Sequence, residues 1–285
     1  MPERLTLDCA GHRLRLDRPL IMGVVNVTPD SFSDGGRFAT REGALDHARR
    51  LVADGADIID VGGESTRPGA EAVPLDAELE RVIPLIADVR AELDVPVSVD
   101  TSKPEVMRAA LAAGAGMIND VNGLRAQGAI ELVARSEAAV CVMHMQGTPR
   151  SMQQRPQYRD VVAEVGAFLS GRADALLARG VAPERIVLDP GFGFGKTLEH
   201  NIALFRGLPE LTAIGYPLLI GVSRKSMIGA LLGNRPVTGR LIGSVAAAML
   251  AVHAGARILR VHDVRETADA LAIQAALGER QTGEG

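Results

Sequence analysis

The chain has 285 residues, of which 47% are hydrophobic, and a formal net charge of −4. This length fits about two ordinary domains or one α/β barrel, a fold that typically takes about 250 residues. The negative charge excludes the overall basic field expected of a protein that binds nucleic acid.

The first expected element is a short β-hairpin within residues 1–17. Apolar residues alternate with polar ones over Leu5–Leu16, and Ala10 and Gly11 fall where the turn belongs. From Pro19 onward, apolar runs typical of buried strands alternate with amphipathic runs typical of helices. The expected strands are Leu20–Val27, Asp57–Gly62, Pro96–Asp100, Gly116–Asp120, Ala139–Met145, Ile186–Asp189, Leu218–Ser223 and Ile258–His262. The expected helices are Arg41–Asp54, Asp76–Leu93, Pro104–Ala113, Ala129–Arg135, Val161–Arg179, Leu198–Phe205, Arg240–His253 and Arg265–Leu277.

This alternation predicts an α/β fold of one kind, the (β/α)8 TIM barrel, with the hairpin as a plug at its N-terminal face. Four glycines, at positions 55, 114, 180 and 255, follow helical runs and suit the position just after a helix end. The chain contains no composition break typical of a linker. We therefore expect a single domain over residues 1–285, with residues 281–285 as a flexible tail.

Targeting and redox features agree with a cytoplasmic protein. The chain has neither a signal-peptide pattern nor an apolar run of the roughly 18 residues that a membrane span needs. Cys9 and Cys141 are too few for a disulfide framework, which indicates a reducing compartment. The expectation is a protein without nucleic-acid or membrane partners.

Polar residues stand where the expected strands end, and the loops after the strands carry the active sites of such barrels. Helix capping explains some of them, but not those that lie within apolar runs or directly at their ends. The unexplained residues are Asn26, Asn119, Asp189, Lys225 and Arg260. A buried carboxylate without a partner is costly, so Asp60, Asp100 and Asp189 need donors. These donors are either Lys225 and Arg260 or a ligand.

The loop after the first expected strand is longer than a turn requires. It contains two aspartates, two serines, a Thr-Pro and a Gly-Gly, together with the aromatic Phe32. A long loop in a compact domain is more often functional or disordered than merely connecting.

Six motifs together resemble the dihydropteroate synthase family of pterin-binding TIM barrels. They are Met22–Gly36, Gly62–Gly69, Ser98–Lys103, Leu188–Lys196, Gly221–Ser226 and Arg260–Asp263. The resemblance covers about residues 20–275 and keeps the order of the family's motifs. It implies the folate-pathway reaction in which a dihydropterin methyl diphosphate and p-aminobenzoate give dihydropteroate and diphosphate.

The resemblance also assigns residues to the pterin. Asp189 would accept hydrogen bonds from the 2-amino group and N3–H of the ring at once. Lys225 would donate to the acceptor side, and Met143 and Phe194 would form apolar walls, although plain core packing remains an alternative for Met143. The complete set expected at the pterin is Asp60, Asp100, Asn119, Met143, Asp189, Phe194, Gly221 and Lys225.

For the diphosphate, the resemblance implies a cationic site that includes Mg²⁺. Arg260 and His262 are two residues apart and share one face of a strand. His262 could instead be a satisfied barrel histidine, but its place beside Arg260 favours anion binding. Asn26 resembles the family's metal ligand, and Mg²⁺ accepts few protein ligands. The expected diphosphate residues are Asn26, Thr66, Arg67, Arg260, Val261 and His262, and the expected catalytic residues are Arg67, Lys225, Arg260 and His262.

The second substrate, p-aminobenzoate, is expected to bind at Asp30, Phe32, Pro68 and Ser223. Closure of the loops Thr28–Arg37 and Glu64–Val73 over both substrates would exclude water. We expect a dissociative, SN1-like mechanism, because the aromatic amine is already neutral at pH 7 and needs no general base.

Three other readings remain open from the sequence. The run Pro190–Thr197 nearly matches a phosphate-binding P-loop, but Pro190 stands where that pattern needs glycine. A methyltetrahydrofolate-dependent methyltransferase would keep the pterin contacts but have no use for Arg67, Arg260 and His262. A non-catalytic pterin-binding protein is the third.

The family resemblance further implies a homodimer. The Ala-rich segment Ser244–Ala254 would suit a flat interface between subunits, but ordinary packing against the barrel explains it almost as well.

Overall fold

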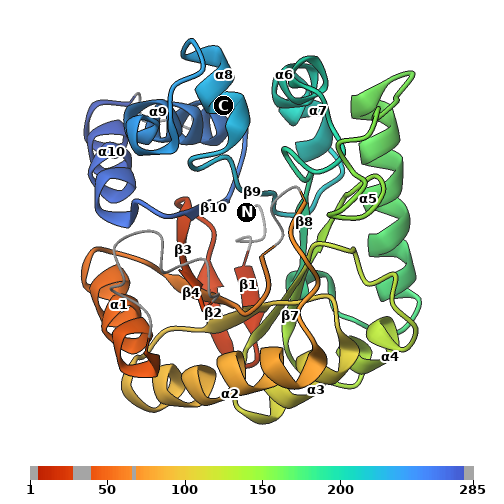
Figure 1. Ribbon diagram of the computed structural model, residues 1–285, viewed down its shortest axis with the longest axis vertical. Coiled ribbons are helices and arrows are strands. Elements are labelled where there is room, and N and C mark those ends of the chain that lie inside the picture. Colours follow the sequence, from red (N-terminus) through yellow and green to blue (C-terminus); the bar gives the residue numbers. More distant parts are fainter. Residues whose placement is uncertain (1–5, 28–39, 66–68, 279–285) are drawn as a thin grey trace, which may run out of the picture.

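A computed structural model describes residues 6–27, 40–65 and 69–278 of the chain. Eight parallel strands form the sheet, in the order β8-β7-β6-β5-β4-β3-β10-β9. An isolated parallel bridge between Leu188 and Leu218, with a 3.0 Å hydrogen bond from Leu188 N to Pro217 O, joins the two ends of the sheet into a barrel. The helices surround it (Figure 1). The predicted (β/α)8 barrel is therefore confirmed.

The strands begin and end close to the predicted positions. They are β3 (Leu20–Asn26), β4 (Ile58–Gly62), β5 (Val97–Asp100), β6 (Met117–Asp120), β7 (Ala139–Met143), β8 (Ile186–Asp189), β9 (Leu219–Ile220) and β10 (Ile258–Val261). The largest difference is β9, which was predicted to continue to Ser223. The chain turns away from the sheet there, with Arg224 in the left-handed region at φ 58° and Lys225 N bonded to Val222 O.

All eight predicted helices are present, with ends shifted by at most two residues. They are α1 (Arg41–Ala53), α2 (Leu75–Glu92), α3 (Pro104–Ala112), α4 (Ala129–Ala134), α5 (Val161–Leu177), α6 (Leu198–Arg206), α9 (Leu241–His253) and α10 (Val264–Leu277). The four glycines expected after helices have φ between 80° and 106°, as that position requires. Two short helices, α7 (Leu208–Thr212) and α8 (Ser226–Leu231), were not predicted. Within the described residues, no helix has the length and apolar character needed to span a lipid bilayer.

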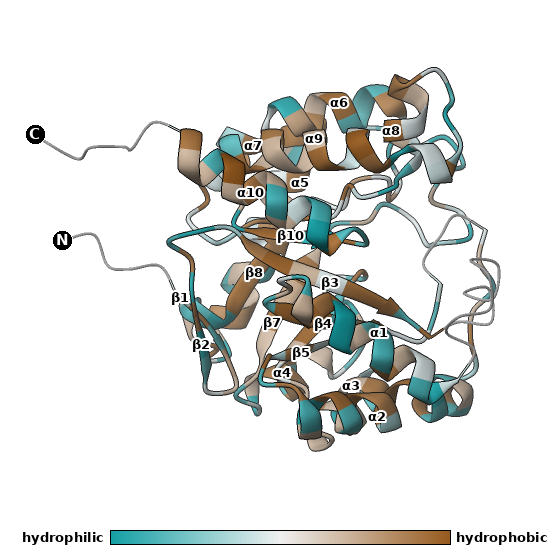
Figure 2. Ribbon diagram, turned by 90° about the vertical axis from the view of Figure 1, so that its left-hand side faces the viewer, coloured by the Kyte–Doolittle hydropathy of each residue, from teal (hydrophilic) through white to brown (hydrophobic). Residues whose placement is uncertain are grey.

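The N-terminal hairpin closes one end of the barrel, as predicted. Its strands are β1 (Thr6–Cys9) and β2 (His12–Arg15). Leu7, Cys9 and Leu16 are buried in a cluster with barrel residues such as Met22 and Met117. Figure 2 shows the hairpin at the end opposite to the arrowhead of β3. The C-terminal ends of the strands thus remain for the functional site.

Candidate functional site

The interior of the barrel changes from apolar to polar along each strand. Successive side chains on one face of a strand are two residues apart. Four strands accordingly place an apolar residue in the lower, plugged half of the barrel and a polar residue above it, nearer the C-terminal end. These pairs are Ile58 and Asp60, Met117 and Asn119, Val187 and Asp189, and Ile258 and Arg260.

Arg260 is the centre of this polar layer. Its Nε donates to Asp60 Oδ2 at 2.6 Å, and its Nη2 donates to Asp100 Oδ2 at 2.8 Å. Asn119 Nδ2 approaches the same Asp60 oxygen at 3.3 Å. The structure therefore brings together four predicted residues from β4, β5, β6 and β10. It also identifies Arg260 as the donor that Asp60 and Asp100 required.

Two carboxylate oxygens in this layer remain available. Asp60 Oδ1 and Asp100 Oδ1 are buried and have no hydrogen-bond partner among the described residues. Ser98 Oγ is likewise buried without such a partner. Burial raises the pKa of Asp100 to about 7, although the charge of Arg260 opposes the shift. Such acceptors suit a ligand that presents N–H groups to the barrel interior.

Asp189 and Lys225 are two further charged residues of the same site, and the charge of each affects the pKa of the other. Asp189 Oδ1 accepts a hydrogen bond from Gly191 N at 2.7 Å. Burial raises the pKa of Asp189, and the charges of Lys225 and Arg260 counteract this rise. Burial lowers the pKa of Lys225 to about 8, against the effect of Asp189. The mutual effects of Asp189 and Arg260 on their pKa values place both residues in one site.

An apolar wall accompanies the charged groups. Phe194 packs on a small cluster that contains Met143 and Met152, separate from the main core. The Lys225 ammonium lies 4.4 Å from the centroid of the Phe194 ring and donates to Phe192 O. Met143 and Phe194 thus belong to one apolar cluster beside the Lys225 ammonium.

The remaining predicted residues that the structure describes lie around the mouth of the barrel. His262 Nδ1 is 3.0 Å from Ser223 Oγ, so these two residues are in contact. Gly221 is next to Arg260, because a Cβ on Gly221 would be 3.8 Å from Arg260 Cβ. The Val261 side chain belongs to the main hydrophobic core, so only its backbone can face a ligand. Asp30, Phe32, Thr66, Arg67 and Pro68, which were also predicted, lie outside the described residues.

Asn26, the predicted metal ligand, ends β3 close to the Asp100 carboxylate. A Cβ on Gly62 would be 3.4 Å from Asn26 Oδ1 and 3.8 Å from Asp100 Oδ2, so both oxygens border the space that this glycine leaves. Oxygen atoms in such a position fit the preference of Mg²⁺. Within the described parts of the chain, no group of three His, Cys, Asp or Glu side chains is placed to hold a metal.

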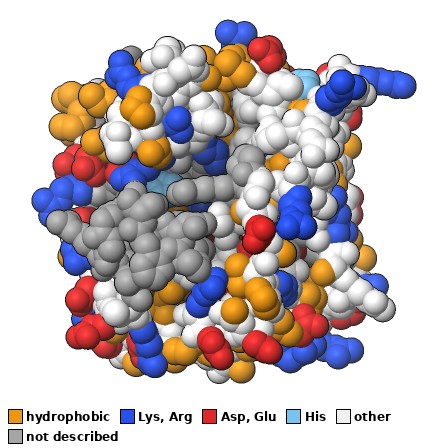
Figure 3. Space-filling model, viewed as in Figure 1, with side chains coloured by type: hydrophobic (Ala, Val, Ile, Leu, Met, Phe, Trp, Pro, Cys, Tyr) orange, Lys and Arg blue, Asp and Glu red, His pale blue; other side chains and the backbone are white. Residues whose placement is uncertain are grey.

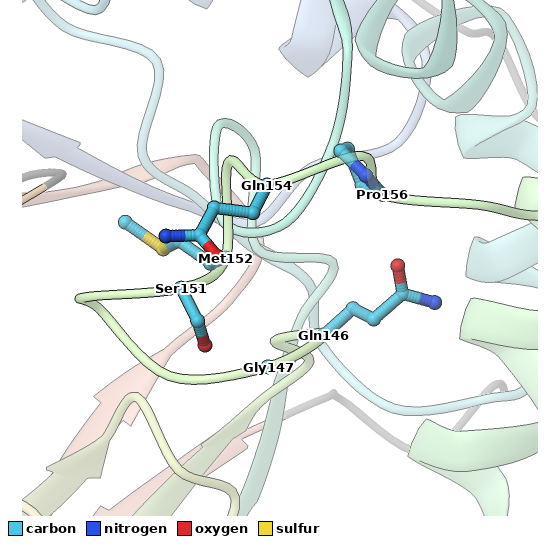
Figure 4. Close-up of a pocket in the computed structure, with 6 residues that line it drawn as sticks. All are labelled: Gln146, Gly147, Ser151, Met152, Gln154 and Pro156. Carbon is cyan, nitrogen blue, oxygen red and sulfur yellow. The ribbon is translucent and has the colours of Figure 1, made fainter.

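A small cavity of about 220 Å³ opens beside this site, in the connection from β7 to α5 (Figure 4). Its lining residues are Gln146, Gly147, Ser151, Met152, Gln154 and Pro156. Met152 links the cavity to the wall formed with Met143 and Phe194. The charged groups of the site are not among its lining residues.

Sequence reasoning missed the backbone groups that serve the site. The Gly191 amide bonds Asp189, and the Phe192 carbonyl accepts from Lys225. Gly191 also packs so closely that a Cβ would be 1.9 Å from His144 O. The signal available in the sequence was the Gly-rich run Pro190–Lys196, which lies within the family motif Leu188–Lys196 and also nearly matches a P-loop.

Comparison with known proteins agrees with this geometry. Residues 22–262 match the family described as pterin binding enzyme. A dihydropteroate synthase from Neisseria meningitidis serogroup C is 57% identical, over 92% of this chain and 94% of that protein. The solved dihydropteroate synthase of Xanthomonas albilineans with 4-aminobenzoic acid has a TM-score of 0.91 and 53% identity, covering 98% of this chain and 100% of that one. The Burkholderia cenocepacia enzyme complexed with 7,8-dihydropteroate has a TM-score of 0.88 and 51% identity, covering 95% and 96%.

Proposed function

The chain belongs to the dihydropteroate synthase family of pterin-binding enzymes, and we propose how its residues carry out the family's reaction. In that reaction of folate biosynthesis, a transferase joins 6-hydroxymethyl-7,8-dihydropterin diphosphate to p-aminobenzoate. The products are 7,8-dihydropteroate and diphosphate. The observation that carries the assignment of roles is the buried polar layer. In this layer Asp60 Oδ1 and Asp100 Oδ1 have no hydrogen-bond partner among the described residues.

The pterin ring lies in this layer, held by hydrogen bonds along its edge. Asp189 accepts from the 2-amino group and N3–H together, an arrangement typical of strong charge-assisted pairs. Asp100 and Asn119 bond the remaining edge, and Lys225 donates to the acceptor side. Phe194 and Met143 cover the faces of the ring, which agrees with their common apolar cluster.

The diphosphate lies toward the mouth of the barrel, near His262 and the exposed part of the Arg260 guanidinium. Arg67 and Thr66 complete the site by resemblance to the family. Asn26 would hold Mg²⁺ through its amide oxygen, which borders the space beside Gly62. When bound, the ion would neutralise part of the diphosphate charge.

The reaction is dissociative. The bond between the pterin methylene carbon and the diphosphate oxygen breaks first, and the bonding electrons leave with the diphosphate. The ring nitrogens delocalise the resulting cation, while Arg260 and His262 stabilise the departing anion with charge that is already in place. The neutral amine of p-aminobenzoate then attacks the methylene carbon and releases a proton to solvent. Ser223 helps to orient p-aminobenzoate, together with Asp30, Phe32 and Pro68 by resemblance.

The roles are tested by measuring diphosphate release and pterin binding separately. With p-aminobenzoate present, the wild-type protein should release diphosphate stoichiometrically with dihydropteroate. Asp189→Asn should mainly weaken pterin binding, because it removes the paired acceptor, whereas Arg67→Ala should mainly slow turnover. Pterin binding by Asp189→Asn as tight as in the wild type would show that the carboxylate assignment is wrong.

We also propose that the protein is a homodimer associated through α9 and α10. Ile242 and Leu250 on α9 are 81% and 60% exposed, and Ile273 and Leu277 on α10 are 61% and 81% exposed. Hydrophobic side chains gather over these helices at the upper left of Figure 3. Large exposed apolar patches commonly mark protein interfaces. The opposite side of α9, with Ser244, Ala247, Ala248 and Ala251, is buried, so the Ala-rich segment also serves barrel packing.

Sedimentation experiments test the dimer. The wild type should sediment as a dimer, and the double variant Ile242→Glu/Leu250→Glu should sediment as a monomer. A monomeric wild type at micromolar concentration would contradict the proposal.

A cytoplasmic location is also proposed, supported by two cysteines that are buried and free.

A further inference from the structure

Lys196 is a buried lysine without a carboxylate partner. It is 2% exposed and lies at the end of the Gly-rich segment between β8 and α6. Among the described residues, no ion pair involves it. A buried charge usually has an ionic partner, so the position requires an explanation.

The ammonium group instead meets neutral acceptors that match its geometry. Lys196 Nζ lies 2.9 Å from Gly191 O, 3.0 Å from His144 Nδ1 and 3.1 Å from Phe194 O. Burial lowers the pKa of Lys196 to about 7, and in the protonated form the ammonium has three hydrogens, one for each of these close acceptors. Burial lowers the pKa of His144 to about 3, which keeps this imidazole neutral and able to accept.

These contacts fix the backbone segment that serves the pterin groups. The amide of Gly191 donates to Asp189. The carbonyl of Phe192, a residue that lies between Gly191 and Phe194, accepts from Lys225. The ring of Phe194 covers the Lys225 ammonium. Lys196 therefore holds the two residues, Gly191 and Phe194, whose positions set the surroundings of Asp189 and Lys225.

The use of lysine in this chain is selective. Of 31 basic residues only three are lysines, Lys103, Lys196 and Lys225, and all the others are arginines. None of the three is exposed: Lys196 is buried, and the other two are partly buried. A planar guanidinium cannot direct three donors from one nitrogen toward three converging acceptors, whereas an ammonium can.

We propose that Lys196 is a positioning residue for pterin binding, which acts by clamping the Gly191–Phe194 segment against His144. The inference rests on the proposed pterin site and adds to it a residue that does not touch the ligand. Removal of the ammonium should release the segment, and with it the alignment of Asp189 and Lys225. The effect should fall on the pterin substrate and leave p-aminobenzoate binding in place.

The test compares Lys196→Met, Asp189→Asn and wild type by calorimetric titration with 6-hydroxymethyl-7,8-dihydropterin diphosphate. Lys196→Met should raise the pterin Kd about tenfold, since hydrogen bonds to charged groups contribute at this level. Its KM for p-aminobenzoate should change by less than about twofold. Gln153 Nε2 also donates to Gly193 O within the segment, and Tyr158 Oη donates to Gly195 O directly after it, so the variant retains other restraints and should fold.

The outcomes separate the inference from the proposed function. An unchanged pterin Kd in Lys196→Met, with weakened binding in Asp189→Asn, would overturn the role of Lys196 alone. Unchanged binding in Asp189→Asn would overturn the pterin site itself. Lys103→Met is the matched control, because Lys103 is held by Glu64 and Glu78 instead and should affect stability more than the pterin Kd.

Variants of His144 test the same clamp without changing the lysine. In His144→Asn the amide oxygen can replace Nδ1 as the acceptor, so pterin affinity should stay close to that of the wild type. His144→Leu removes the acceptor and should weaken pterin binding. The effects of Lys196→Met and His144→Leu should be less than additive in the double variant, and full additivity would overturn the clamp.

Discussion

The two halves of the barrel interior use the same strands for opposite purposes. In the half that the hairpin closes, side chains such as Met117 and Val187 are apolar and fully buried. Nearer the C-terminal ends of the strands, the buried carboxylates of Asp60 and Asp100 bind the guanidinium of Arg260. The lower half gains stability from every contact, whereas the upper half contains charges that are stable only as a set. Substitutions should therefore affect folding and function in different proportions in the two halves.

The largest effect is expected for Arg260→Met in the upper half. This change leaves the carboxylates of Asp60 and Asp100 buried without a cation, which should cost about 3–5 kcal/mol of unfolding free energy. Activity should be lost as well. Chemical denaturation and a diphosphate-release assay measure the two effects.

The control for this prediction is the triple variant Asp60→Asn/Asp100→Asn/Arg260→Met. It removes all three charges and should recover much of the stability but none of the activity. If Arg260→Met alone unfolds at the same denaturant concentration as the wild type, the charged set does not depend on Arg260.

A second large effect is expected in the lower half for Leu7→Ala. Leu7 has 0% exposure in the cluster between hairpin and barrel, and truncation of such a side chain costs about 2–5 kcal/mol. The KM values for both substrates should stay unchanged below the melting transition. Arg13→Ala, an exposed change in the same hairpin, should alter neither quantity. A large change in pterin KM for Leu7→Ala would mean that the two halves are not independent.

The sequence was sufficient for the fold because each strand is a continuous apolar run and each predicted helix has its own amphipathic pattern. It was also sufficient to bring Asp189 and Lys225 to one end of the barrel. The pairing of Arg260 with Asp60 and Asp100 spans 200 and 160 residues and depends on how the closed barrel aligns its strands. The sequence therefore left open whether a side chain or a ligand supplied the donor. The sequence indicates no role for Lys196, because two of its close acceptors are backbone carbonyls, which any residue provides.

The pH dependence of pterin capture should be bell-shaped. As the pH falls through the raised pKa of Asp189, protonation removes an acceptor, and kcat/KM for the pterin substrate decreases. As the pH rises through about 8, Lys225 loses its proton and its donor charge, and kcat/KM decreases again. Each limb should approach about a tenfold loss per pH unit.

The variant Lys225→Met serves as the control for the basic limb. Its kcat/KM should be lower than that of the wild type at pH 7 but should show no further loss between pH 8 and about 9.5, the interval in which a lysine with a pKa of about 8 loses its proton. A wild-type profile that stays flat across that interval would contradict the assignment.

The smallest effect is expected for Ser223→Ala at the mouth of the barrel. The change removes the hydroxyl that contacts His262 Nδ1 at 3.0 Å. Loss of one such hydrogen bond is worth about 1 kcal/mol, so kcat should fall about fivefold while pterin Kd stays the same. Ser226→Ala, an exposed serine at the start of α8, should leave kcat unchanged. Equal rates for the two variants would show that Ser223 contributes to turnover neither by orienting p-aminobenzoate nor through its contact with His262.

The distribution of lysine has a practical consequence for handling the protein. Reagents directed at primary amines, such as succinimidyl esters of dyes or activated resins, find no exposed lysine among the described residues, since the outer surface carries arginine. Any lysine coupling that does occur is directed to the mouth of the barrel and should inactivate the molecule. Attachment through introduced surface cysteines, with Cys9 and Cys141 both buried, is a route that leaves the site intact.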